Sequence, residues 1–147
     1  MKTIRNIFVL MLVVAIIEGL FTQLSSCKKK DPTPTEDIVT KRLIANNWIM
    51  QSVTVDGADK TSVYPGLTIK FTESSFTTTH GGVVWPASGI WEYTSTDHTV
   101  IKRNDGLPVT VEVTDTTLKL SLIWATTTLG GRIASVQGQH VFNFVKQ

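Results

Sequence analysis

From Trp48 to the C-terminus the chain repeats one pattern, in which apolar and polar side chains alternate along short runs. In one such run Val109, Val111 and Val113 are each separated by a polar residue. A period of two residues is typical of a β-strand with one buried face. Turn residues separate the runs about every 8–12 residues, the spacing expected of a β-sandwich or barrel. The pattern therefore predicts an all-β domain.

We expect one short helix at residues 38–45, with Asp37 as a candidate N-cap, followed by eight strands. The expected strands are residues 48–55, 67–72, 75–80, 90–94, 99–103, 109–114, 117–124 and 139–145. Asn104-Asp105-Gly106 predicts a tight hairpin between the fifth and sixth. Eight short antiparallel strands with tight hairpins favour a small up-and-down barrel. A two-sheet sandwich is the main alternative.

The alternation also predicts which side chains point inward. Besides the three valines, the expected inward residues are Ile69, Phe71, Trp91, Tyr93, Leu118, Leu120, Leu122, Trp124, Phe142 and Phe144. The last strand has Val141 and Val145 on its other face, so we expect it to be apolar on both. The first strand is ambiguous, because Trp48 and Met50 have one parity and Val53 has the other.

The N-terminus reads as a secretory signal. Lys2 and Arg5 precede an unbroken apolar run of eleven residues, 7–17. That run is shorter than the roughly 20 apolar residues of a membrane-spanning helix, but it fits the core of a signal peptide. Leu24-Ser25-Ser26-Cys27 resembles the lipobox at which bacterial lipoprotein precursors are cut and lipidated. We predict a signal peptide at residues 1–26 and lipidation of Cys27. A chance Cys after an ordinary or an uncleaved signal is the alternative.

A tether and one domain follow the signal. Residues 27–37 are rich in Lys, Pro and Thr, which predicts an extended linker. Lys28–Lys30 could rest on anionic headgroups or stay solvated. In related bacterial lipoproteins an acidic run after the Cys resembles a surface-export signal; the run here is basic, which favours the periplasmic face of the outer membrane, with the cell surface as the alternative. Residues 38–147, about 110, suffice for one small domain. Cys27 is the only Cys, so no disulfide is expected.

At this point the residues resemble a family. The chain has Asn46-Asn47-Trp48 after a short helix, then residues 51–57 (QSVTVDG) and later residues 112–120 (EVTDTTLKL). With the lipobox and the tether, these resemble the lipocalin-like lipoproteins of gut-type Gram-negative bacteria. The resemblance implies an eight-stranded barrel whose base is closed by Trp48. A late basic residue stacks on this Trp in lipocalins, and Arg132 is a candidate here; a plain core position for Trp48 is the simpler interpretation.

The composition argues against several functions. The chain carries 14 basic and 12 acidic side chains, too even a balance for a nucleic-acid surface. His80, His98 and His140 have no zinc-ligand spacing and no Cys partner, so we expect no metal. Asp97-His98 lies in an ordinary turn, and no paired carboxylates or nucleophile with a base are evident. We therefore expect neither a cofactor nor catalysis.

Four aromatic residues are candidates to line a ligand cavity. They are Trp85, Trp91, Tyr93 and Trp124, and each could equally fill a core. Trp85 lies in an apolar segment flanked by Gly and Pro, residues 83–86, which suggests a lid at the mouth of the barrel or a contact with a partner. Two functions follow: a membrane-tethered barrel that binds a small hydrophobic molecule, or a protein-interaction or envelope-structure module with a filled barrel. The protein partner is unknown.

Overall fold

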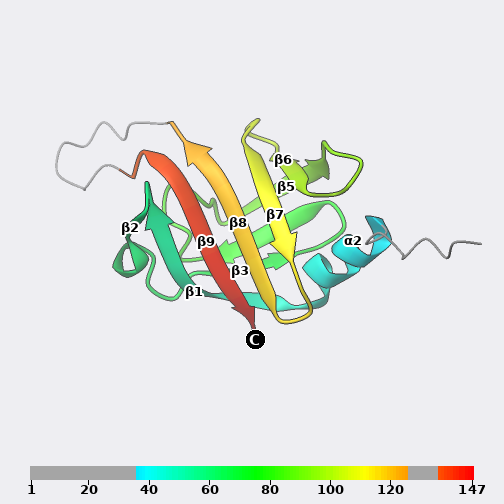
Figure 1. Cartoon of the computed structure of the whole chain (residues 1–147), viewed down its shortest axis with the longest axis horizontal. Helices are drawn as coiled ribbons and strands as arrows, with labels where there is room; N and C mark the ends of the chain where they lie inside the picture. The colour runs from blue at the N-terminus through cyan, green and yellow to red at the C-terminus, as the bar shows by residue number, and fades with distance from the viewer. Residues whose placement is uncertain (1–35, 126–135) are drawn as a thin grey trace, which may run out of the picture. The chain divides into compact units, whose positions relative to one another are not determined.

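The computed structural model describes residues 36–125 and 136–147, which belong to one compact unit. One helix, α2 (Glu36–Ala45), precedes the strands (Figure 1). The strands are β1 (Asn47–Val55), β2 (Ala58–Asp59), β3 (Thr68–Phe71), β4 (Ser75–Thr79), β5 (Ser88–Tyr93), β6 (Val100–Arg103), β7 (Pro108–Val113), β8 (Thr117–Trp124) and β9 (Gly138–Lys146). All eight predicted strands are present, within two residues at each end. The structure adds the two-residue β2 and a short 3-10 helix, η1 (Thr61–Val63).

The strands close into an eight-stranded antiparallel barrel. Each pairs with its neighbour in the order β1-β3-β4-β5-β6-β7-β8-β9, and β2 only extends the end of β1. Pairing of β1 with β9, from Trp48 opposite Lys146 to Val55 opposite His140, closes the circle. Figure 1 shows β9 lying between β8 and β1. The barrel prediction is thus confirmed and the two-sheet sandwich is excluded.

A bulge in β1 resolves the ambiguous parity of the first strand. Met50 lies opposite Phe144 and Ser52 opposite Asn143, so Gln51 is one residue extra in β1. Such an insertion shifts the later side chains to the other face. Trp48 therefore points inward before the bulge and Val53 after it, and both are fully buried.

The predicted inward residues form the core. Each is buried or partly buried and packed against the core cluster. Outward residues of β9, Val141 and Val145, are half-buried, which agrees with the prediction that this strand is apolar on both faces. No helix in residues 36–125 and 136–147 is long and apolar enough to cross a membrane.

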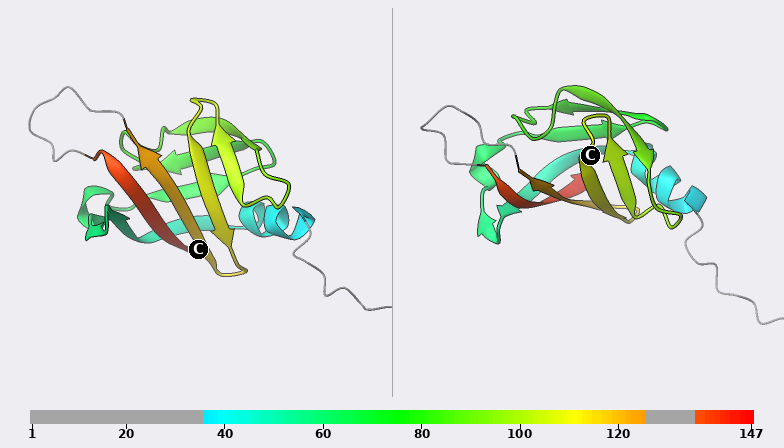
Figure 2. Two further views of the ribbon diagram at one scale, coloured as in Figure 1. Left: turned by 45° about the horizontal axis from the view of Figure 1, so that its top comes forward. Right: turned by 90° about the horizontal axis from the view of Figure 1, so that it is seen from above.

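Helix α2 lies across the end of the barrel at which β1 begins (Figure 2). Leu43 is fully buried there, and Trp48 Nε1 donates a hydrogen bond to its carbonyl oxygen (2.9 Å). Arg42 pairs with Asp115 in the β7–β8 turn (2.7 Å). The helix begins at Glu36, so Asp37 lies inside it and the predicted N-cap was wrong. The last two residues of the predicted tether, 36 and 37, belong to α2. Cys27, the rest of the tether and Arg132 lie outside the described residues.

Candidate functional site at the mouth of the barrel

The end of the barrel remote from α2 is called the mouth below. Strand β1 ends there at Val55, β8 ends at Trp124 and β9 begins at Gly138. The turn between β6 and β7, residues 104–107, lies at the same end, because β7 starts where β8 finishes. The segment after β4 also arrives here, since Thr79 at the end of β4 pairs with Thr68 at the start of β3.

Residues 81–86, the mouth segment, fold into this opening. Trp85 and Val84 are 1% and 0% exposed, whereas Val83 is 51% exposed. The indole of Trp85 is thus an interior group and is not exposed as part of a contact loop, whereas Val83 remains exposed; contact of the segment with a partner stays a prediction. The segment is a tight turn, with Trp85 N–H donating to the Gly81 carbonyl (3.1 Å). A Cβ on Gly81 would collide with the Trp85 carbonyl oxygen, so the turn requires glycine there.

Trp85 reaches across the interior. Its ring makes edge-to-face contacts with Phe76 of β4 (5.6 Å between centroids) and with Phe142 of β9 (6.2 Å). Strands β4 and β9 are not neighbours in the sheet, so the indole bridges two separated walls. Such edge-to-face pairs contribute about 0.5–1.5 kcal/mol each beyond burial. The mouth segment therefore acts as a plug in the structure.

Arg103 holds the plug in place. This guanidinium is only 2% exposed, although Arg is rarely buried. Its Nη1 donates to the Val84 carbonyl (2.6 Å) and its Nη2 pairs with Asp105 (2.5 Å). Cζ lies 5.0 Å from the centre of the Trp85 ring. Sequence reasoning missed Arg103, yet it shares the inward parity of Ile101 on the same strand, and that signal would have found it.

Three buried N–H donors at the mouth have no hydrogen-bond partner among the residues that the structure describes. They are Trp85 Nε1, Arg103 Nε and Trp124 Nε1. A buried donor left unpaired costs about 1–3 kcal/mol. The mouth thus carries unused capacity to donate hydrogen bonds to an acceptor, in a setting that is otherwise aromatic. Trp85 and Trp124 are two of the four predicted ligand-lining residues.

The other two predicted residues lie elsewhere. Trp91 Nε1 donates to the Ser75 carbonyl (3.0 Å), and the Trp91 ring contacts Tyr93 edge to face (4.9 Å). Tyr93 is bound to α2, because its hydroxyl accepts a hydrogen bond from Thr40 (3.1 Å). The structure therefore places Tyr93 at the α2 end and does not gather the four aromatics into one site.

A buried Tyr–His pair lies beneath the mouth. His140 is fully buried; Nδ1 is 3.1 Å from the Gly138 carbonyl, and Nε2 is 3.1 Å from the Tyr64 hydroxyl. A carbonyl can only accept, so Nδ1 carries the hydrogen and Nε2 accepts from Tyr64. Burial lowers the pKa of His140, against opposing effects of the Gly138 carbonyl and the Asp56 carboxylate. Burial also raises the pKa of Tyr64 to about 12.

This pair predicts a loss of stability in mild acid. Because the folded pKa of His140 lies below its unfolded value of 6.5, the unfolded chain binds the proton first. The contribution of neutral His140 to the free energy of unfolding is fully present above pH 6.5. It falls as the pH drops below 6.5, by at most about 1.4 kcal/mol per pH unit. Urea unfolding at several pH values measures this. His140→Phe should flatten the slope and exposed His80→Gln should not; equal slopes in both would contradict the assignment.

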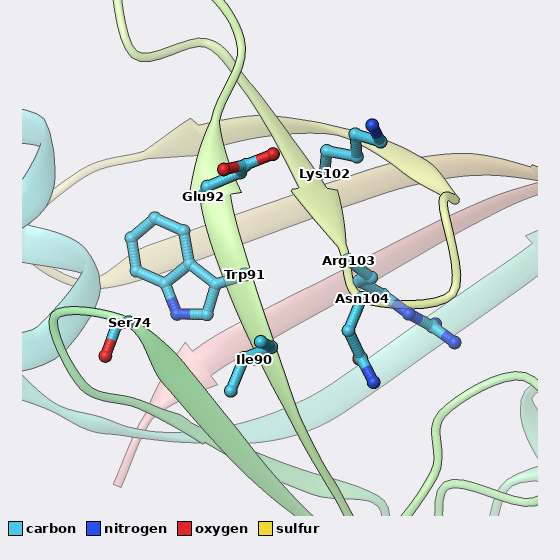
Figure 3. A pocket seen from close by; sticks show the side chains of 7 residues that line it. All are labelled: Ser74, Ile90, Trp91, Glu92, Lys102, Arg103 and Asn104. Atoms are coloured by element: carbon cyan, nitrogen blue, oxygen red, sulfur yellow. The ribbon is translucent and has the colours of Figure 1, made fainter.

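A pocket of about 320 Å³ lies on the barrel wall (Figure 3). Its lining residues come from β5, β6 and the turns beside them: Ser74, Ile90, Trp91, Glu92, Lys102, Arg103 and Asn104. Figure 3 shows the Trp91 ring extending from β5 on the side of Ser74. Ile90 is 62% exposed, and Glu92 lies opposite Lys102 on the next strand. The wall pocket thus combines an exposed apolar side chain with side chains of both charges.

Within residues 36–125 and 136–147, no three His, Cys, Asp or Glu side chains lie close enough together to hold a metal ion. Neither a scan against protein families nor a search of curated proteins finds a match for the chain. The function must therefore be argued from the mouth itself.

Proposed function

We propose that this protein is a lipoprotein anchored in the cell envelope through Cys27, and that its barrel binds a small, mainly apolar molecule at the mouth. The observation that carries the proposal is the set of three buried, unpaired donors: Trp85 Nε1, Arg103 Nε and Trp124 Nε1. In a barrel with a purely structural core, apolar residues at these positions would avoid the free-energy cost of burying unpaired donors. Ligand entry would relieve this cost, because an acceptor atom on an otherwise apolar ligand would pair a donor that stays buried, and a donor displaced from the interior would reach water.

The chain's connectivity is compatible with such a role. The tether joins the barrel at Glu36, the start of α2, and the mouth is at the other end. Two or more acyl chains on Cys27 would hold the protein stably, because each buried methylene contributes about 0.8 kcal/mol. We place it at the outer membrane facing the periplasm, with the cell surface as the alternative. Cys27→Ser should release the protein from membranes; retention in the membrane fraction would rule out the lipid anchor.

The four indole N–H groups test the ligand proposal. Trp48 and Trp91 donate to backbone carbonyls, whereas Trp85 and Trp124 have no acceptor within residues 36–125 and 136–147. In a ¹H–¹⁵N spectrum the first two should resonate downfield of the second two. A lipid extract of the envelope should then shift the Trp85 and Trp124 signals and leave those of Trp48 and Trp91 in place. If no indole signal responds, the barrel is not a carrier for any envelope lipid.

A second candidate function is an interaction or envelope-structure module with a filled barrel. It is favoured by the rings that cross the interior, including the Trp85–Phe142 contact, and by exposed Ile90 in the wall pocket. In-cell crosslinking separates the two functions. Under this alternative a specific crosslinked partner should be lost on Ile90→Asp, while Ile123→Asp on β8 serves as a control; Ile123 is 67% exposed.

A further inference from the structure

We propose that the mouth segment is a displaceable plug, and that Arg103 is the anchor for a carboxylate on the ligand that replaces it. The ligand class is an amphipathic monoanion: a flat apolar body about the size of an indole, bearing one carboxylate. This inference rests on the proposed function and adds to it both the chemistry of the ligand and the means by which the site is kept closed.

The anion preference follows from the electrostatics of Arg103. A guanidinium at 2% exposure is costly to bury unless it is well paired. Its single carboxylate partner, Asp105, is 42% exposed and comes from the adjoining turn, so it can turn outward into water. Nε has no hydrogen-bond partner among the described residues, and Nη1 donates to the Val84 carbonyl. When Asp105 turns outward, Nη2 becomes free beside Nε on the same edge of the guanidinium, and these two N–H groups match a carboxylate. Withdrawal of the mouth segment would make room for that carboxylate.

The preference for a flat apolar body follows from the space that Trp85 fills. Its indole lies between the Phe76 and Phe142 rings and beneath the Arg103 guanidinium. Any group that replaces it meets the same two ring edges and the same cation. An aromatic or fused-ring body preserves these contacts, and a carboxylate on that body reaches Arg103. When the ligand is bound, the displaced Trp85 side chain lies in water, so its Nε1 is no longer a buried donor without a partner.

The segment is built so that it can leave. Gly81 and Gly82 stand at its start, and Gly82 has a φ of +63°, a conformation that favours glycine. Beyond ring contacts and the buried Val84 side chain, the segment is held to the barrel by the Arg103–Val84 bond and by Thr78. The Thr78 hydroxyl donates to the Pro86 carbonyl (2.7 Å) and lies 3.4 Å from the Trp85 carbonyl, and its N–H donates to the Ala87 carbonyl next to the segment (2.9 Å). Val83 is exposed. Few bonds oppose its displacement, in contrast to the continuous ladder of the strands around it.

The test uses 1-naphthylacetate and its neutral counterpart, 1-naphthylacetamide, as probes. The full chain is prepared in lipid nanodiscs, and calorimetric titrations are corrected with empty nanodiscs. The wild type should bind the carboxylate about tenfold more tightly than the amide, because a charge-assisted bond to Arg103 forms only with the anion. Arg103→Met keeps an apolar side chain of similar length and should abolish the preference for the anion.

Two further variants should bind more tightly, a result that structural damage would not produce. Trp85→Ala removes the plug, so affinity for the carboxylate should rise about tenfold. Asp105→Asn removes the competing carboxylate and should raise affinity for the anion several-fold but leave the amide unchanged. The Asn side chain keeps an oxygen that can accept from Arg103 Nη2 and from the Leu107 N–H at this partly exposed position, so this variant should fold. Weaker or unchanged binding of 1-naphthylacetate in both variants would contradict the proposal that the mouth segment is a displaceable plug.

The outcomes also separate this inference from the function on which it rests. Equal binding of acid and amide to wild type and to Arg103→Met would leave ligand binding at the mouth intact and refute the anion anchor. Absence of binding of either probe to wild type, Trp85→Ala and Asp105→Asn refutes the plug and the anchor. If the envelope extract also leaves all four indole signals unmoved, the proposed function fails as well.

Discussion

Phe142→Ala should cost about 3–5 kcal/mol of unfolding free energy, the range measured when a large aromatic is removed from a packed core. Phe142 is fully buried. Its ring contacts the rings of Tyr64, Trp85, His140 and Phe144. Removing it leaves a cavity where the mouth segment meets β9. Urea unfolding monitored by circular dichroism gives the change.

The matched control is Ile123→Ala on the neighbouring strand. Ile123 is 67% exposed, so its truncation should change stability by less than about 0.5 kcal/mol. A loss below about 1 kcal/mol for Phe142→Ala would mean that the ring is not packed as the structure has it. The mouth would then be loosely filled, and the argument for a plug would lose its support.

Trp48→Ala should produce a loss of similar size, again about 3–5 kcal/mol. Trp48 is fully buried at the α2 end and its Nε1 donates to the Leu43 carbonyl, one of the last carbonyls of the helix. These carbonyls have no partner within the helix. The variant therefore empties part of the core and detaches the helix that covers this end of the barrel.

Trp48→Phe separates the two effects. It keeps most of the ring volume and leaves the Leu43 carbonyl unpaired, for a loss of about 1–3 kcal/mol. Amide hydrogen exchange should then speed up in α2 more than in β1. Exposed Asn47→Ala is the control and should leave α2 unchanged. Uniform acceleration over helix and strand would show that α2 is not held by this hydrogen bond.

The strands could be predicted because their signal is local. A side-chain period of two and turn residues such as Asn104-Asp105-Gly106 need no knowledge of the rest of the molecule. The bulge at Gln51 is different, because it exists only in relation to the register of β9. The sequence showed two parities in the first strand, and only the pairing with β9 explains them.

The site was less predictable, because its geometry is set by partners far away in sequence. Trp85 lies in a segment whose composition is typical of a surface loop. It is buried because its ring packs against Phe76 and Phe142, which are distant in sequence. Arg103 lies two residues after Ile101, so the alternation alone would place its side chain inside the barrel. A charged side chain is expected at the surface, and that expectation hid the inward position. Trp91 and Tyr93 were correctly expected to point inward, yet their height along the barrel depends on the strand stagger.

The most direct measurement of the central claim is native mass spectrometry of the mature lipoprotein, released from its own envelope into a mild detergent and ejected intact. If the mouth binds a small molecule, a stoichiometric adduct should accompany the protein and vanish on denaturation. It should be an amphipathic acid, reduced in Arg103→Met and retained in Ile123→Ala. A clean mass for lipidated chain alone, unchanged after incubation with envelope lipids and bile acids, would contradict the account and favour a filled barrel that acts through protein contacts.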